Sequence, residues 1–196
     1  MTFTELLAEV YILTNRADLV DETKSAVKNA TLRLHHTDYY AKDIFETGIS
    51  FASSEYKHSL DIYSLYSNFR AWKYIKRVES ASDEYGQLIT IIDPIETLDK
   101  FGRLRTDVAY IAGRATEIRC AVEFQYLLTG FYVTPVITEV GYSSWIADLV
   151  PYAIVYEAAR RILNSIDEFD KANKMAQSAA EELIMVKQLG LANEGY

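Results

Sequence analysis

Cysteine, proline and glycine are all scarce in this 196-residue chain, which contains one, three and eight of them. Because Cys120 stands alone, no intramolecular disulfide can form, and cysteine usage gives no sign of an oxidising compartment. Long apolar runs are missing too, and none approaches the roughly 20 residues that span a bilayer. The first ten residues, MTFTELLAEV, carry acids where a secretory signal would carry bases. We therefore expect an intracellular protein without a membrane segment.

Positive charge is also in short supply. The chain has 20 Lys and Arg against 28 Asp and Glu, which gives a net charge of −8. A protein that clamps nucleic acid needs cations to neutralise phosphates, so the composition argues against that class. Solubility is a sufficient explanation for most acidic proteins. A less common explanation is a surface that DNA passes without sticking to it.

The N-terminal residues predict a helical hairpin over residues 1–46. Thr2 and Glu5 have the spacing of a capping box, which starts a helix. Asn15 to Ala17 break this helix, and Asp18 is expected to cap a second one. Apolar residues at helical spacing mark the inward faces, with Phe3, Leu6, Leu7, Val10 and Leu13 in the first helix and Val20, Thr23, Val27, Ala30, Thr31 and Leu34 in the second.

Residues 144–190 predict a second helical hairpin. Pro151 starts its first helix, because proline fits the first turn, where its missing amide is not needed. Gly190 is expected to end its second helix in a left-handed C-cap. Residues 191–196 have no regular pattern and are interpreted as a docking tail. The apolar stripes are Ile146, Leu149, Ala153, Ile154, Ala158 and Ile162, then Phe169, Ala172, Met175, Ala176, Ala179, Leu183 and Val186.

Between the hairpins, residues 47–143 alternate as strands do. A short helical turn over Tyr39 to Phe45 precedes them, and another is predicted over Pro94 to Lys100. Gly113 and Arg114 suit a two-residue hairpin turn, and Gly130 suggests a bulge. The predicted strands start at Ile49 and run over His58 to Tyr63, Phe69 to Val78, Gln87 to Ile92, Val108 to Ala112, Ala115 to Ala121 and Phe124 to Val133.

Helices, then strands, then helices indicate an α+β fold. At this length the chain is one domain, or one compact domain with an appended element. We expect the N- and C-terminal helical hairpins to form a four-helix bundle, with an inserted antiparallel β-sheet or barrel-like region. The expected segments are residues 1–46, 47–143, 144–190 and 191–196.

The residues that could carry catalysis give weak signals. His35 and His36 are adjacent, so they lack the i, i+4 spacing of a zinc helix and are interpreted as partial cations near a helix C-terminus. His58 stands alone in a strand, and Cys120 in an alternating strand is interpreted as a buried structural thiol. Phosphate-loop and G-x-S-x-G motifs are missing. We expect no enzyme activity, no metal site and no cofactor.

Arg160 and Arg161 form the sharpest basic pair. The simpler interpretation is that they form salt bridges with Glu157 on the same helix. The functional interpretation is an anchor to an acidic partner surface. A second group of basic residues alternates with aromatic ones; its members are Arg70, Lys73, Lys76 and Arg77. Such alternation could mark a nucleic-acid-binding face. Because these residues fall on both faces of one strand, we favour a strand in a half-solvated sheet.

The order of elements resembles the head-to-tail adaptor proteins of tailed, especially short-tailed, bacteriophages. Three features carry the resemblance: paired amphipathic helices over Thr2 to His36, a β insertion, and Leu149 to Ile154 running into Ala158-Ala159-Arg160. A second amphipathic helix and a short glycine-containing tail follow. The resemblance covers almost the whole chain, and it is one of layout more than of invariant chemistry.

The resemblance implies a virion protein at the head–tail junction, assembled in the host cytoplasm. Such adaptors form a homo-oligomeric ring, commonly of twelve copies, that joins the portal to the tail nozzle or tube and lets DNA through the lumen without sequence-specific binding. Their helices form the body, their β parts meet the tail, and their C-terminal tail docks on the portal. Carried over to this chain, the portal-docking residues are Arg160, Arg161, Leu191 and Tyr196.

Two other classes remain open. One is a small acidic hydrolase, and the other is a monomeric protein that binds one partner. The 15 tyrosines favour subunit contacts, since tyrosine offers an apolar ring with a polar end. The mass of the pure protein, alone and with portal, would separate these classes.

Overall fold

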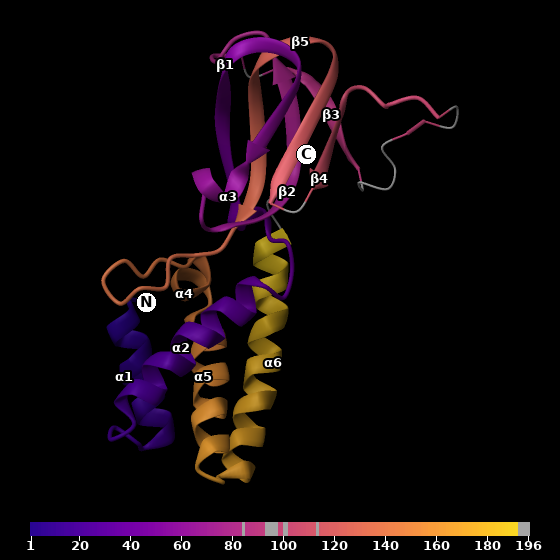
Figure 1. The fold of residues 1–196 in the computed structure, drawn as a ribbon. Coiled ribbons are helices and arrows are strands. Elements are labelled where there is room, and N and C mark those ends of the chain that lie inside the picture. The colour runs from indigo at the N-terminus through magenta and orange to yellow at the C-terminus, as the bar shows by residue number, and fades with distance from the viewer. Residues whose placement is uncertain (84, 93–97, 100–101, 113, 192–196) are drawn as a thin grey trace. The chain divides into compact units, whose positions relative to one another are not determined.

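The computed structural model describes residues 1–83, 85–92, 98–99, 102–112 and 114–191. The chain divides into two compact units (Figure 1). The helical unit combines both ends of the chain, residues Met1–Asp43 and Thr134–Tyr196. The barrel unit is the continuous stretch Ile44–Val133. We describe each unit by itself.

The helical unit contains five α-helices and one 3₁₀ turn in its described residues. They are α1 (Phe3–Thr14), α2 (Val20–His35), the 3₁₀ turn η1 (Ala41–Asp43), α4 (Trp145–Leu149), α5 (Pro151–Ser165) and α6 (Phe169–Leu191). The capping box of Thr2 and Glu5 is confirmed, and Pro151 stands in the first turn of α5 as predicted. The prediction for Asp18 is wrong. Leu19 holds the N-cap position of α2, while Asp18 pairs with Arg16 at 2.7 Å.

The α+β class is observed, but the predicted four-helix bundle is wrong. Helix α5 forms the centre of the helical unit, and α1, α2, α4 and α6 pack against it. Residues on nearly every side of α5 are buried, including Ala153, Ile154, Val155 and Ala159. By contrast, α6 buries only Ala172, Val186 and Gly190 among its 23 residues. Periodicity predicted one apolar stripe on each helix. In the structure α5 is buried on nearly all sides, whereas most of α6 is exposed or half-exposed.

The predicted C-cap at Gly190 is also wrong, because α6 continues to Leu191. Gly190 is buried against the ring of Tyr40, and a Cβ at this position would collide with that ring. The glycine therefore serves close packing rather than a left-handed turn. Leu191 is helical and exposed. The rest of the expected docking tail, including Tyr196, lies outside the described residues.

The barrel unit is a four-stranded closed barrel with one extra strand. Strands β5, β2, β3 and β4 follow one another and β4 pairs back to β5, while β1 adds to β5. The sequence predicted an antiparallel sheet. This prediction is wrong for one pair of strands, because β3 and β4 run parallel. Its elements are β1 (Ile44–Asp61), the short helix α3 (Ile62–Leu65), β2 (Phe69–Val78), β3 (Gln87–Ile92), β4 (Val108–Ala112) and β5 (Ala115–Val133).

Two strands are longer than predicted. Strand β1 begins at Ile44, where a helical turn was expected, and β5 runs without a break through the two strands predicted there. The bulges that involve Gly130 lie on its partner β2, where extra residues interrupt the pairing between Phe69 and Tyr74. Gly130 itself makes room for the ring of Tyr74. The predicted turn over Pro94 to Lys100 falls mostly outside the described residues, as does Gly113.

The barrel interior is apolar and rich in aromatic rings. Phe131 is fully buried and lies 5.4 Å from the ring of Phe69 and 5.7 Å from that of Trp72. Around these rings pack branched residues of the strands, namely Ile75, Ile89, Ile118 and Leu127. Ring edges and faces of this kind add a geometric preference to the burial of area.

Candidate partner-binding groove

Three arginines converge on one buried carboxylate in the helical unit. Glu157 on α5 accepts hydrogen bonds from Arg160 at 2.8 and 2.9 Å and from Arg161 at 3.2 Å. Arg33, which comes from α2, donates to the same carboxylate at 2.6 Å. The predicted salt bridges of Arg160 and Arg161 with Glu157 are therefore confirmed. Three cations around one anion leave two positive charges on a chain whose net charge is −8.

The environment keeps Glu157 ionised. Burial acts to raise the pKa of its carboxyl, but the hydrogen bonds and charges of Arg160, Arg161 and Arg33 outweigh burial and leave the pKa below its ordinary value. The same hydrogen bond to Glu157 acts on Arg160, where it raises the pKa of the guanidinium. Contact with the arginines therefore favours the charged form of the Glu157 carboxyl, and contact with Glu157 favours the charged form of Arg160.

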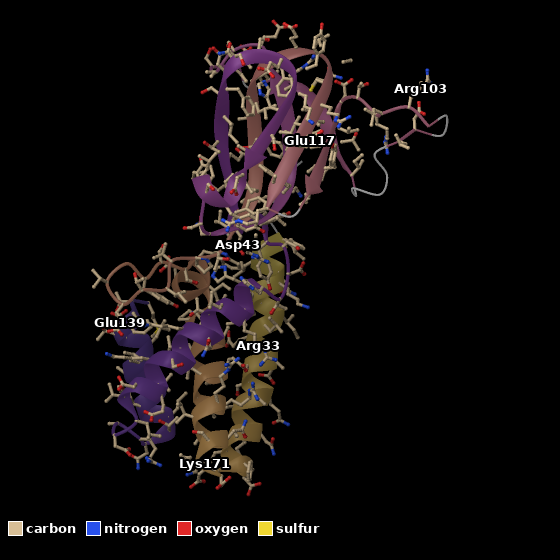
Figure 2. The ribbon with its side chains drawn as sticks, in the orientation of Figure 1. Arg33, Asp43, Arg103, Glu117, Glu139 and Lys171 are labelled. Carbon is tan, nitrogen blue, oxygen red and sulfur yellow. The ribbon has the colours of Figure 1, made fainter. Side chains whose placement is uncertain are left out.

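A groove of about 360 Å³ opens beside this cluster. Arg33 of α2 and Thr37, which follows α2, line one side of the groove, and Glu157 and Arg160 of α5 line another. Figure 2 shows Arg33 at the side of the helical unit where α6 lies. The remaining lining is apolar and mostly small, with Leu34 from α2 and Ala176, Ala179, Ala180 and Leu183 from α6. Short side chains on α6 leave this space unfilled, so the groove offers cationic walls above an apolar floor.

The structure separates the two arginines that the sequence treats as a pair. Arg160 lines the groove between α2 and α6. Arg161 instead lines a second, more open hollow between α2 and α5, together with the acidic residues Asp21 and Glu22. Of the two arginines predicted from the sequence, Arg160 alone lines the cationic groove. Its second arginine is Arg33 of α2. Arg33 was missed because it lies 124 residues from Glu157, and nothing local in the sequence links them.

A second cluster of polar side chains is buried where α2, η1 and α4 meet. His35 Nδ1 lies 2.8 Å from Asp43, and His35 Nε2 lies 2.8 Å from the hydroxyl of Ser144. Trp145 donates its indole N–H to the same Asp43 oxygen at 2.8 Å. A carboxylate oxygen accepts, so the contact with Asp43 has His35 Nδ1 as its donor, and Nε2 lies in hydrogen-bond contact with the Ser144 hydroxyl. The order Ser–His–Asp is that of a hydrolytic triad.

Access and local geometry give this cluster a structural role. The exposed fractions of His35, Asp43 and Ser144 are 1, 4 and 4%. Ser144 is also the N-cap of α4 and accepts the amide of Ala147. A substrate could reach its hydroxyl only after the helical unit opened. His35 lies in the last turn of α2, as predicted, and its buried contacts with Asp43 and Ser144 were not predicted. The available signal was its position four residues after the inward-facing Thr31, on the buried side of α2.

The remaining sequence candidates are packed within the barrel unit. His58 stacks on Phe51 at 3.8 Å and contacts the carbonyl of Phe124 at 2.9 Å, as expected of a packed histidine. Cys120 is buried, and burial is the main reason that the pKa of its thiol rises to about 11, so the structural interpretation is confirmed. Of the basic residues on β2, Arg77 bonds to Gln87, and Lys76 lies over the ring of Tyr74.

The described ranges contain no group of three His, Cys, Asp or Glu residues placed to hold a metal ion. None of the helices in those ranges is both long and apolar enough to cross a membrane. No protein-family model matches the chain, and no curated protein matches its sequence.

Proposed function

We propose that the chain is a structural virion protein, a head-to-tail adaptor that forms part of a ring between a portal and a tail in a tailed phage. The ring, commonly of twelve copies in the family that the chain resembles, surrounds the passage through which DNA leaves. The protein acts by contact alone, at the head–tail junction.

One observation carries the proposal: a long helix exposes an apolar surface that the unit itself does not cover. Helix α6 leaves several large apolar side chains exposed, which are Phe169, Ile184, Met185, Leu189 and Leu191. Exposed apolar residues gathered on one element are typical of protein–protein contact. The cationic groove beside them adds a charged feature of the kind that fixes orientation and partner choice.

Layout and charge support the same proposal. The helical unit is built from both ends of the chain, with the sheet inserted between them, and that order is the basis of the resemblance. A net charge of −8 suits a lumen past which a polyanion slides. Of the residues expected to dock on the portal, Arg161, Leu191 and Tyr196 keep that assignment, whereas Arg160 lines the groove. The barrel unit is assigned to the tail.

Mass measurement of the pure protein, alone and with portal, tests the proposal. We expect either a ring of the protein alone or a ring that forms on the portal. A protein that stays monomeric and ignores portal would contradict it. Truncation after Leu191 then tests the tail while sparing the packing of Gly190 on Tyr40. The truncated protein should keep its thermal midpoint and lose affinity for portal, and unchanged affinity would move the docking site to the helices.

A monomeric partner-binding protein is the second candidate, and the groove beside Arg33 and Arg160 favours it. A monomeric mass together with a one-to-one complex would select this candidate over a ring.

A further inference from the structure

The outer face of α1 carries a stripe whose chemistry is opposite to that of the groove. Glu5, Ala8, Glu9 and Ile12 recur at intervals of three or four residues, which places them along one side of the helix. Ile12 is 72% exposed, Glu5 and Ala8 are exposed, and Glu9 is half-exposed. We call these four residues the α1 stripe. It offers two carboxylates and one large apolar side chain to solvent.

The α1 stripe stands on a firmly supported helix. The amide of Thr2 donates to the Glu5 carboxylate at 2.8 Å, and this hydrogen bond lowers the pKa of Glu5. The opposite side of the helix is anchored in the core, where Phe3, Leu6, Leu7 and Val10 are buried. The stripe therefore stands on a fixed helix face, and a partner that binds it does not have to order a loop first.

Stripe and groove are complementary in charge and in apolar content. The groove has Arg33 and Arg160 on its walls and an alanine and leucine floor, so it can pair with carboxylates and accept a branched apolar side chain. Arg33 is well placed for this, because its side chain is 57% exposed and makes a single hydrogen bond within the described part of the chain. In Figure 1, α1 and α6 lie on opposite sides of α5. One copy therefore cannot fill its own groove with its own stripe.

We propose that the α1 stripe of one copy docks in the groove of the next copy, with Ile12 on the alanine floor and Glu9 against Arg33 and Arg160. A contact between two different surfaces of the same chain is head-to-tail, and it closes into a ring or continues as a filament. This inference rests on the proposed function and names the contact between ring subunits. A single contact of this size is weak, and a closed ring gains because each copy makes two of them.

The first experiment measures mass by sedimentation over a range of protein and salt concentrations. Ile12→Asp removes the apolar element, and Arg33→Glu reverses the charge of one groove wall. Each should weaken association at least about tenfold, which corresponds to about 1.4 kcal/mol. Leu149→Asp is the matched control, because Leu149 is 51% exposed and belongs to neither surface. A thermal melt of each variant checks folding, and Arg33→Gln replaces Arg33→Glu if the melt shifts.

The second experiment swaps charges. Glu9→Arg should also prevent assembly by itself, since it places a cation against the groove. A mixture of the Glu9→Arg and Arg33→Glu proteins should assemble again, because each stripe now meets a groove of opposite charge. The chain that carries both changes should assemble alone. These recoveries would not occur if either variant had simply lost its fold.

The outcomes separate this inference from the proposed function. A wild-type ring that survives Ile12→Asp and Arg33→Glu would overturn the stripe-and-groove contact and leave the adaptor proposal standing. Equal damage from Leu149→Asp, or failure of the charge swap, would also overturn the contact. A wild-type chain that stays monomeric at every concentration and also on portal would overturn both proposals.

Discussion

The barrel unit and the helical unit are assembled from the chain in different ways. The barrel is one continuous stretch, and its charge cluster lies wholly within that stretch, since Glu117 bonds to Tyr110, Lys57 and Arg119. The helical unit joins the two ends of the chain, and its Glu157 is bonded across 124 residues by Arg33. The barrel therefore contains everything that its core needs, whereas neither half of the helical unit has a core of its own.

Loss of the centre of the helical unit should have the largest effect. Ile154 on α5 is fully buried, so Ile154→Asp places an unpaired carboxylate in the core and should cost about 4 kcal/mol. Chemical denaturation monitored by circular dichroism would measure this loss. Hydrogen exchange should show helical amides losing protection while the strands keep theirs. Leu149→Asp serves as the exposed control, and simultaneous loss of strand protection would show that the two units unfold together.

A methyl group at Gly190 should cost more than one at Gly130. The Gly190→Ala methyl meets the fully buried ring of Tyr40, which has little room to move, and we expect a loss of about 2 kcal/mol. The Gly130→Ala methyl meets the half-buried ring of Tyr74, which can turn outward after giving up its bond to Glu46. That loss should stay below about 1 kcal/mol. If urea denaturation gave the same loss of unfolding free energy for both variants, the two rings would not differ in their freedom to move.

Acid should weaken both charge clusters. Although burial acts against it, hydrogen bonding from Tyr110, Lys57 and Arg119 lowers the pKa of Glu117 from 4.5 to about 2. The pKa of Glu157 is lowered as well. A carboxyl whose pKa is lowered by folding stabilises fully above its unfolded value, and that stabilisation is lost as the pH falls through the folded value. For Glu117 the loss should spread from about pH 4.5 to about pH 2.

Glutamine variants measure these contributions. Glu117→Gln and Glu157→Gln should each cost about 1 kcal/mol at neutral pH, and the cost should shrink as the acidic range is entered. Unfolding midpoints in urea, taken at several pH values, would show this convergence. A cost that is the same at neutral and acidic pH would mean that the lost side-chain charge is not the cause.

The smallest effect concerns Cys120, which should report on the barrel without disturbing it. Burial raises the pKa of this thiol to about 11, so it should react with a thiol reagent at neutral pH only when the barrel opens. Reaction should be slow in the native protein and fast in denaturant. If the barrel is independent, Ile154→Asp should leave the slow rate unchanged. A fast rate in that variant would link the two units.

The sequence predicted local elements well and their assembly poorly. The capping box at Thr2, the start of α5 at Pro151 and the strand from Phe69 to Val78 each follow from a few neighbouring residues. The enclosure of α5 and the openness of α6 do not follow, because an apolar stripe shows which side of a helix faces inward and not how many neighbours cover it.

The candidate site was predicted only in part. Helical spacing was enough to pair Arg160 and Arg161 with Glu157. The contribution of Arg33, the separation of Arg161 into another hollow and the alanine floor all depend on how α2 and α6 lie along α5. The same limit applies to the partners of His35, since Asp43 and Ser144 come from two different connections.

The insertion of the barrel between the two parts of the helical unit also affects how the chain is made. At about 5 to 20 residues per second, α2 is complete roughly 7 to 26 seconds before α5 is complete. During that time the whole barrel emerges and can fold, while Leu6, Val10 and Val27 have no α5 to pack on. Nascent chains halted after Val133 should therefore show a barrel that resists protease and an N-terminal segment that does not. If α1 and α2 resisted protease in such halted chains, they would have to pack against another part of the chain before α5 is made.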